Sequence, residues 1–332
     1  MNITKKQIDD LNLELTLQIA AEDYAEIERK KLAERRRTAE FKGFRKGMVP
    51  ASLIKRVYGE QALADAVNEV ISDALDKYIS DNSLKLLGEP LGSENQPEIV
   101  WEDGNDFTFV FDAALSPEVK VEVEASDEIV KYSVTTSAKE KASMTESMKK
   151  YYENAKEGEP RKTDEEIDKE VAERLQENHR REAEWRLDRD IRNFYVAKSG
   201  IVLPEAFLKR WLFAANQGKF SKEDIEKDFA GFAEDFKWQM VRGTLLKQFG
   251  FEITREDLEN EAKEYVRYQY AMYGLSEVPE DMLGEAVGNI MGDRKQIEQL
   301  AERVEDRKVL DKIKETATFK TKKISSEKFR EL

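Results

Sequence analysis

Near the start of the chain, hydrophobic positions alternate with polar ones. The apolar residues are Leu11, Leu13, Leu15, Leu17 and Ile19, with Asn12, Glu14, Thr16 and Gln18 between them. Because successive side chains of a strand point to opposite sides, this period of two puts the apolar set on one face. The pattern predicts a half-buried strand over residues 11–19.

The next segments have the pattern of helices. One is expected from Glu22 to about Glu40, and a short one after Pro50, which suits a first helical turn and precedes a break at Gly59. Further apolar positions recur at steps of three and four: Leu63, Ala66, Val67, Val70, Ile71, Ala74, Leu75, Tyr78 and Ile79. They predict an amphipathic helix whose apolar face covers a sheet.

Alternation returns around Pro117, with Phe107, Phe109 and Phe111 before it and Val119, Val121 and Val123 after it. The period of two is thereby restored around Pro117, so we expect strands to flank the helix pair on both sides. Strand, helices and strands together predict a compact α+β domain over residues 1–118.

From about Ala138 the pattern is helical almost throughout. Glycines at 200, 218, 250 and 274 end helices, and the pairs Ser221 with Asp224 and Thr254 with Asp257 have the spacing of N-caps. The polar stretch from Tyr151 to Thr163 contains Gly158 and Pro160. We interpret residues 119–163 as a linker and junction, and residues 164–332 as a mainly α-helical, elongated C-terminal domain.

The helix expected from about Asp164 to Lys198 has a thin apolar stripe amid dense charge. Acid-first pairs four residues apart, such as Glu170 with Arg174, stabilise an exposed helix by a few tenths, ~0.2–0.5, of a kcal/mol each. Only one side of such a helix is expected to be buried, so it can project as an arm.

Length and composition fit about two domains of a helix-rich protein. The chain has 332 residues, of which 37% are charged, and no cysteine. Disulfides, thiolate metal sites and cysteine nucleophiles are thereby excluded. The N-terminus lacks the continuous apolar stretch of a secretory signal, and no apolar run approaches the ~18 residues of a membrane span. A cytoplasmic protein with no membrane partner is expected.

Positive charge is concentrated in residues 29–56. This segment holds eleven Lys/Arg and two acids, a balance of +9, whereas the whole chain carries −14 and the remainder therefore −23. Gathered cations dominate the local field only within a Debye length, ~8–10 Å. One part of an otherwise acidic protein can thus approach a polyanion.

Inside this segment lies the octet Gly43-Phe44-Arg45-Lys46-Gly47-Met48-Val49-Pro50. Its two glycines permit positive φ angles, which would present Phe44 and the two cations at a loop tip. The segment is either a docking loop with an exposed apolar anchor or an ordinary solvated turn between two helices.

Catalytic constellations are scarce. His179 is the one histidine, and its spacing from Leu175 and Ala183 fits the edge of a helical stripe better than a metal or triad role. The glycines at 43 and 47 lack the Lys-Ser/Thr ending and preceding strand of a nucleotide loop. No carboxylate pair stands out for acid–base work. We predict no catalytic residue, no metal and no cofactor.

Two sets of large side chains leave alternatives open. Phe207, Trp211, Phe229, Phe232, Phe236 and Trp238 form either helix core or an exposed apolar patch for other proteins. Tyr265, Tyr268, Tyr270, Met272 and Tyr273 cannot all face one way on a helix. The helix is either buried on two sides or partly exposed for adaptable contacts.

The octet and the following Ala51–Gly59 resemble the ribosome-binding signature of the trigger factor family, Gly-Phe-Arg-x-Gly-x-x-Pro. Gly43, Phe44, Arg45, Gly47 and Pro50 match the pattern; Lys46 is also common in the family, whereas Met48 stands where lysine is frequent. The order of elements resembles the family over residues 1–118 and, more weakly, over 164–332.

The resemblance implies a chaperone that acts without ATP. Its loop would dock beside the ribosomal exit tunnel, on a ribosomal protein and nearby rRNA, and its helical body, with two arms, would form a cradle for unfolded nascent chains. The implied ribosome-binding residues are Gly43, Phe44, Arg45, Lys46, Gly47 and Pro50, supported by Arg35, Arg36, Arg37 and Lys42; the candidate client-binding residues are Trp211, Phe213, Phe229, Phe232, Tyr268 and Met272. A homodimer off the ribosome is a further implied partner state.

One departure from the family is large. Trigger factors usually carry an inserted prolyl isomerase domain of the FK506-binding type. In this chain Lys139–Ala155 resembles the helix that leads into that domain, and the next helix starts near Asp164, so the interval leaves no room for it. We therefore expect no isomerase activity. The rival hypothesis is an RNA-binding or ribosome-assembly factor that uses the basic 29–56 segment and has no client cradle. A peptide- or proline-directed enzyme lacks supporting motifs.

Overall fold

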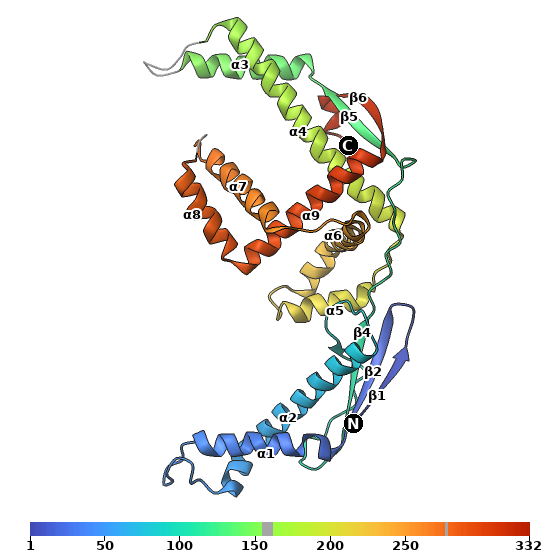
Figure 1. Ribbon diagram of the computed structural model, residues 1–332, viewed down its shortest axis with the longest axis vertical. Helices are drawn as coiled ribbons and strands as arrows, with labels where there is room; N and C mark the ends of the chain where they lie inside the picture. Colours follow the sequence, from blue (N-terminus) through green and yellow to red (C-terminus); the bar gives the residue numbers. More distant parts are fainter. Residues whose placement is uncertain (155–161, 276–277) are drawn as a thin grey trace. The chain divides into compact units, whose positions relative to one another are not determined.

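The computed structural model describes residues 1–154, 162–275 and 278–332 of the chain (Figure 1). It contains two compact units. Unit 1 comprises Met1–Glu118 and Val202–Ala233, and unit 2 comprises Val119–Ile201 and Glu234–Leu332. Gly158 and Pro160, expected in the junction, lie outside the described residues.

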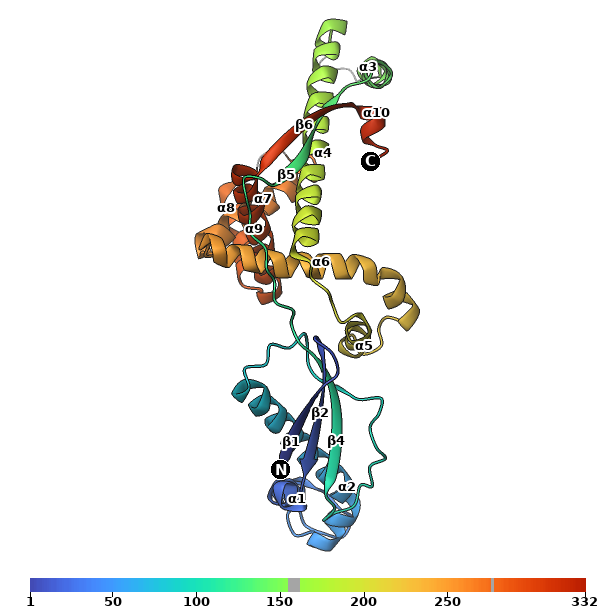
Figure 2. The same ribbon diagram turned by 90° about the vertical axis from the view of Figure 1, so that its right-hand side faces the viewer.

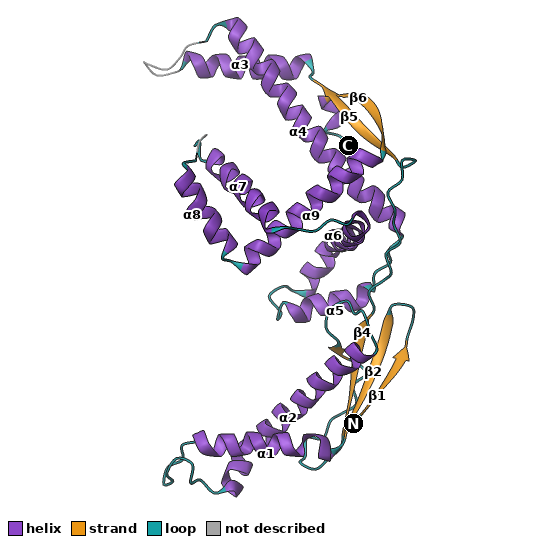
Figure 3. Ribbon diagram, in the orientation of Figure 1, coloured by secondary structure: helices purple, strands orange, loops and turns teal. Residues whose placement is uncertain are grey.

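Unit 1 contains an antiparallel sheet in the order β1-β2-β4-β3 (Figure 3). The strands are β1 (Asn2–Gln7), β2 (Asn12–Ile19), β3 (Leu91–Gly92) and β4 (Phe107–Ala114). The strand predicted over 11–19 is confirmed as β2, and the phenylalanine alternation as β4. β1 was not predicted, because its largely polar, lysine-containing sequence shows no apolar alternation.

Helices α1 (Ala21–Thr38) and α2 (Ala51–Asp81) form a hairpin in this unit. The expected break at Gly59 is wrong, since α2 is continuous through it. A glycine inside a helix costs only about 1 kcal/mol. Burial of one apolar side chain contributes about 1.5–3 kcal/mol, so the nine buried residues of α2 outweigh that cost.

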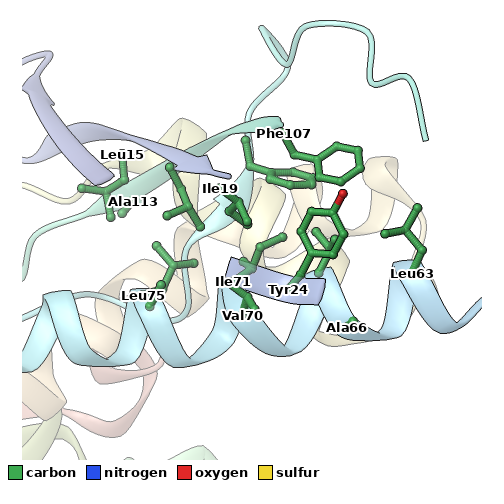
Figure 4. Packing of buried hydrophobic residues seen from close by; sticks show 14 of the residues in the cluster. Leu15, Ile19, Tyr24, Leu63, Ala66, Val70, Ile71, Leu75, Phe107 and Ala113 are labelled. Atoms are coloured by element: carbon green, nitrogen blue, oxygen red, sulfur yellow. The ribbon is translucent and has the colours of Figure 1, made fainter. Parts of the chain in front are cut away.

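The core of unit 1 lies between the sheet and α2. The apolar side chains of β2 are at most 1% exposed, and those of Ala66 and Val67 on α2 are fully buried. Figure 4 shows Tyr24 of α1 beside Phe107, with Val70 and Ile71 of α2 nearby. The Tyr24 hydroxyl donates to Asn105 O and accepts from Gly104 N, both at 2.9 Å. These two bonds satisfy the polar atom of a buried ring.

Unit 1 also includes α5 (Glu205–Ala215) and the first part of α6 (Lys222–Phe249). Arg210 of α5 binds Asp112 of β4 at 2.6 Å and donates to Gly92 O at 2.9 Å. Trp211 lies so close to Gly88, whose φ is +76°, that a Cβ there would be 2.4 Å from the indole nitrogen. An ion pair and a close ring-to-backbone contact thus fix α5 to the sheet. The sequence interpretation had grouped this helix with residues 164–332.

Unit 2 is mainly helical. Its elements, besides the rest of α6, are β5 (Glu128–Thr135), α3 (Ala138–Glu153), α4 (Asp164–Ser199), α7 (Arg255–Met272), α8 (Glu280–Met291), α9 (Arg294–Thr316), β6 (Thr318–Ser325) and α10 (Ser326–Phe329). The fold is thus an α+β N-terminal region followed by a mostly helical part, as predicted. The long helix from Asp164 and the caps at Thr254 and Gly200 are confirmed.

The strand expected at Val119, Val121 and Val123 is wrong. These residues have no strand structure; Val121 is buried, and its carbonyl accepts from Gln248 Nε2 at 2.8 Å. The segment predicted as linker instead contributes β5, which pairs in parallel with β6, and α3 (Figure 2). Alternation alone could not identify the paired strand, because a ladder needs a partner and here it comes from far along the chain.

Two helical hairpins occur in unit 2. The α3–α4 hairpin packs around Met148, Ile167, Val171 and Leu175. The α7–α8 hairpin packs with α9 around Ala262, Val266, Leu283, Val287, Ile290 and Leu300. The contact between the two helices of each hairpin is thus a narrow apolar stripe.

Asp306 of α9 connects three helices of unit 2. It accepts from Trp238 Nε1 at 2.7 Å, and from Arg242 Nη1 and Arg192 Nη2 at 3.2 Å each. Trp238 is 5% exposed and Arg242 8%. A half-buried carboxylate with three donors therefore ties α4 and α6 to α9.

Gly88→Ala is expected to destabilise unit 1 by at least about 2 kcal/mol, because a left-handed φ and a collision with Trp211 act together. Gly104→Ala is the matched control: φ is +88°, but no atom lies within 4 Å of the added Cβ. Its expected cost is about 1 kcal/mol. Urea unfolding followed by circular dichroism measures both, and equal losses would contradict the contact's importance.

Asp306→Ala is expected to lower the free energy of unfolding by roughly 3 kcal/mol, since Arg242 loses one of its two carboxylate partners while it stays buried. Asp311→Ala removes an exposed carboxylate from the same helix and should change the unfolding free energy by less than about 0.5 kcal/mol. The same urea titration compares the two variants. A loss at Asp306 no larger than that at Asp311 would refute the role assigned to the carboxylate.

Candidate functional site

The octet lies in the loop between α1 and α2, at the end of the hairpin remote from the strands (Figure 1). Phe44 is 43% exposed, and Arg45 and Lys46 are also exposed. The structure thus brings together the six residues predicted as ribosome-binding. It presents an aromatic ring and two cations side by side on the surface.

Two consecutive tight turns produce this arrangement. Phe44 N donates to Phe41 O at 3.1 Å, and Met48 N donates to Arg45 O at 2.9 Å. Gly43 and Gly47 occupy the third positions of these turns, with φ of +93° and +80°. A type II turn requires positive φ at this position, which explains both glycines.

A small apolar cluster anchors the loop at its base. Ala39, Val49 and Ile54 are buried there, and the Phe41 ring packs edge-on against Tyr58 at 6.2 Å. Because the loop's flanks are fixed, its tip is presented without a large ordering cost on binding.

The supporting basic side chains have two kinds of environment. Arg36 donates from Nε to Val49 O at 2.8 Å, and the Arg35 guanidinium lies 6.0 Å from the centre of the Tyr58 ring. Arg37 and Lys42 are exposed and make no side-chain bond among the described residues. Arg35 and Arg36 therefore also hold the loop in place, whereas Arg37 and Lys42 are available to a partner.

Further along α1, Glu28 is only 5% exposed and lies beside Asp103. Burial raises the pKa of Glu28, and the negative charge of Asp103 raises it further. Lys55 of α2 forms an ion pair with Asp103, and its hydrogen bond lowers the pKa of that carboxyl. The group joins both helices of the hairpin to the loop that precedes β4, so it stabilises the hairpin that carries the octet.

The candidate client residues divide between the two units. Trp211, Phe213, Phe229 and Phe232 lie in unit 1, whereas Tyr268 and Met272 lie in unit 2. Phe229 is 5% exposed and packs against Phe232, with ring centres 5.9 Å apart. Trp211 and Phe213 are half-buried.

Phe213 lines a cavity of about 420 Å³ in unit 1. The cavity lies beside β3 and is also lined by Leu91, Ala214 and Ile225, with Lys209 and Lys222 among its polar residues. The Lys222 ammonium lies 5.6 Å from the centre of the Phe213 ring. Apolar walls and cationic side chains could accommodate one large apolar side chain of a partner.

Tyr268 and Met272 belong to an apolar patch at the loop end of the α7–α8 hairpin. They are 65% and 71% exposed. Tyr273 at 87%, Leu275 and Met282 extend the patch. The sequence had left two-sided burial open for α7; these exposures show that its C-terminal end is accessible. Leu275 and Met282 were missed, because nothing in their local spacing distinguishes surface from core.

His179 has a structural environment. It is 4% exposed, and its Nε2 lies 3.1 Å from Glu140 Oε2, while Oε1 of the same carboxylate binds Arg330. It therefore joins α4 to α3 and α10.

Within the described ranges no group of three or more His, Cys, Asp or Glu side chains is placed to hold a metal ion. Among the described helices, none is long and apolar enough to cross a membrane.

Two family models match the chain. Bacterial trigger factor protein (TF) matches residues 1–148, and probable trigger factor, C-terminal domain, matches residues 183–332. The two matches together cover most of the sequence, and residues 149–182 lie between them.

Curated relatives match shorter segments. Trigger factors from Azospirillum brasilense and Geobacter sp. (strain M21) are 32% and 30% identical over 120 and 131 residues, which is 36% and 40% of this chain. The trigger factor of Methylocella silvestris is 31% identical over 125 residues. The matched segments span only 26%, 29% and 27% of these relatives' own lengths.

A solved structure has a similar fold. That structure is described as "Promiscuous Substrate Recognition in Folding and Assembly Activities of the Trigger Factor Chaperone". Its TM-score with this chain is 0.53, at 17% sequence identity. The superposition covers 94% of this chain and 99% of the other. The likeness extends the shared fold over nearly the full sequence.

Proposed function

Because the chain belongs to the trigger factor family, we propose that it is an ATP-independent chaperone that docks at the ribosomal exit tunnel and holds unfolded nascent chains. The observation that carries this proposal is the exposed Phe44-Arg45-Lys46 tip, held by two glycine turns at the end of a fixed hairpin. The ribosome and unfolded polypeptides are the proposed partners, and the cytoplasm is the proposed location.

The docking step combines two forces. The basic segment 29–56 attracts the phosphate-rich ribosomal surface, while the acidic remainder of the chain is repelled from it, so the field orients the approach. Phe44 then supplies an apolar anchor that can be buried against protein or a base face. Fixed flanks limit the entropy lost when the tip is bound.

The holding step uses exposed apolar side chains. The patch of Tyr268, Met272, Tyr273, Leu275 and Met282 offers flexible thioethers and rings with a polar tip, which adapt to many apolar sequences. The cavity beside Phe213 supplies a second subsite. Binding at each subsite is weak, and several together give useful affinity to an unfolded chain.

No step of this proposal needs ATP, a metal or proline isomerisation. The rival hypothesis, an RNA-binding factor without client binding, also requires the basic segment but gives no role to the exposed patch on α7 and α8. Exposed large apolar side chains gathered at one hairpin end favour the chaperone.

Replacing Phe44, Arg45 and Lys46 together by Ala is expected to weaken ribosome binding at least about tenfold, because an apolar anchor and two phosphate-facing cations are lost. Co-sedimentation with ribosomes measures the effect. The matched control replaces Lys219, Phe220 and Lys227 by Ala. These side chains are also exposed, and their replacement removes the same charge and one aromatic ring.

The control triple variant should bind ribosomes as the parent does. Undiminished binding by the loop variant would refute the docking assignment. The rival hypothesis would be favoured by two results together: free RNA competes fully with ribosomes for the protein, and the protein fails to suppress aggregation.

The double variant Tyr268→Gln/Met272→Gln is expected to require several-fold more protein to suppress aggregation of an unfolded client without ribosomes, since it makes the exposed patch polar. Light scattering measures suppression. Trp185→Gln/Val202→Gln is the control, because these side chains are 65% and 67% exposed but lie outside the patch. Equal losses in both variants would show that the patch has no special role.

A further inference from the structure

One face of the β5–β6 ribbon in unit 2 carries four polar side chains that have no hydrogen-bond or ion-pair partner within the described part of the chain. In the parallel register Lys131 lies opposite Thr321, and Ser133 lies opposite Lys323. Paired residues and residues two apart share a face of a sheet, so these four side chains lie together. We call this set the ribbon face. None of the four side chains makes a hydrogen bond or ion pair within the described part of the chain.

The ribbon face opens onto a cavity of about 600 Å³. Lys131, Ser133 and Thr321 line it together with one side of α4. Figure 2 shows β5 and β6 running beside that helix. Phe319 and Leu187 add apolar walls. The cavity is therefore an open groove with two hydroxyl groups, a free ammonium and an apolar floor.

The other cations of the groove are already neutralised. Lys314 binds Asp188 at 2.6 Å, and Arg180 binds Glu177 at 2.8 Å. Lys131 in the groove and Lys323 on the same ribbon face are left without a counter-charge among the described residues. Unpaired ammonium and hydroxyl groups on one face are suited to carboxylates, which accept several hydrogen bonds each.

We propose that the ribbon face binds acidic, extended segments of unfolded polypeptides. An extended chain repeats its side-chain direction every two residues, about 6.6–6.8 Å, which is the same step that separates the side chains along the ribbon. Carboxylates at alternate positions would meet the two lysines, and the apolar side chains between them, which point the other way, would face Leu187 on α4. The inference rests on the proposed chaperone function. It adds a class of client, acidic extended segments, that the apolar patch on α7 and α8 cannot select.

A nucleic acid fits this groove less well. Glu184 lines the cavity, and Glu177, Glu182 and Asp188 lie on the same helix. A continuous phosphate backbone would meet Glu184 in the groove, whereas a peptide can place a neutral residue beside it. Charge complementarity therefore favours a polypeptide with spaced acids.

The test uses the full chain and two fluorescent peptides that differ only in Glu or Gln at alternate positions between apolar residues. Fluorescence anisotropy should show the Glu peptide binding about tenfold more tightly than the Gln peptide. The variant Lys131→Gln/Lys323→Gln should lose that preference, and Lys131→Arg/Lys323→Arg should keep it, which separates loss of charge from loss of fold.

The matched control is Lys322→Gln/Lys328→Gln. Lys322 neighbours Lys323 but points to the opposite face, and the change in net charge is the same. This variant should weaken Glu-peptide binding less than about twofold, the effect of a screened distant charge. Equal weakening by both variants, or equal binding of the two peptides, would overturn the inference.

An RNA oligonucleotide that displaces the peptide from the parent protein and binds the parent more tightly than Lys131→Gln/Lys323→Gln would overturn it too, in favour of a nucleic-acid site. The proposed chaperone function fails by a separate result, namely absence of aggregation suppression by the parent protein with an apolar client. The two failures are therefore distinguishable.

Discussion

Unit 2 depends on one carboxylate that three side chains share. Asp306 accepts hydrogen bonds from Arg192, Trp238 and Arg242, which belong to two other helices. The Arg242 guanidinium is buried, and a lone buried charge would be strongly unfavourable, so its pairing with Asp306 offsets the desolvation. Because α9 follows the α7–α8 hairpin and leads into β6, fixing α9 also fixes the two surfaces that we assign to clients. The positions of the apolar patch and of the ribbon face both follow from this contact.

Unit 1 is stabilised differently. Its sheet and α2 bury a continuous apolar core, and polar groups such as the Tyr24 hydroxyl are satisfied at the edge. The docking loop has its own small cluster around Val49. Changes at the exposed tip therefore do not disturb the main core. This separation lets the loop carry an exposed aromatic ring and exposed cations at little cost to stability.

Local pattern was sufficient where one segment determines its own structure. The β2 alternation, the apolar stripe of α2, the caps at Thr254 and Gly200, and the two loop glycines could all be identified from the sequence. The structure of other segments depends on contacts with residues far away in the sequence. Val119, Val121 and Val123 alternate like a strand but have no neighbouring strand, whereas β5 pairs with distant β6. The attachment of Trp211 at Gly88, and the exposure of Met272, likewise depend on packing that spacing cannot reveal.

The parallel pairing of β5 with β6 also has a kinetic consequence. Glu128 and Lys320, which form an ion pair across this ribbon, are 192 residues apart in sequence. Synthesis proceeds at about 5–20 residues per second, so β5 leaves the ribosome roughly 10–40 s before its partner. During that interval the β1–β2 hairpin can form from local contacts, while β5 stays unpaired. A newly made copy of this protein thus exposes an unpaired strand edge, with which other chains can pair, until β6 has been synthesised.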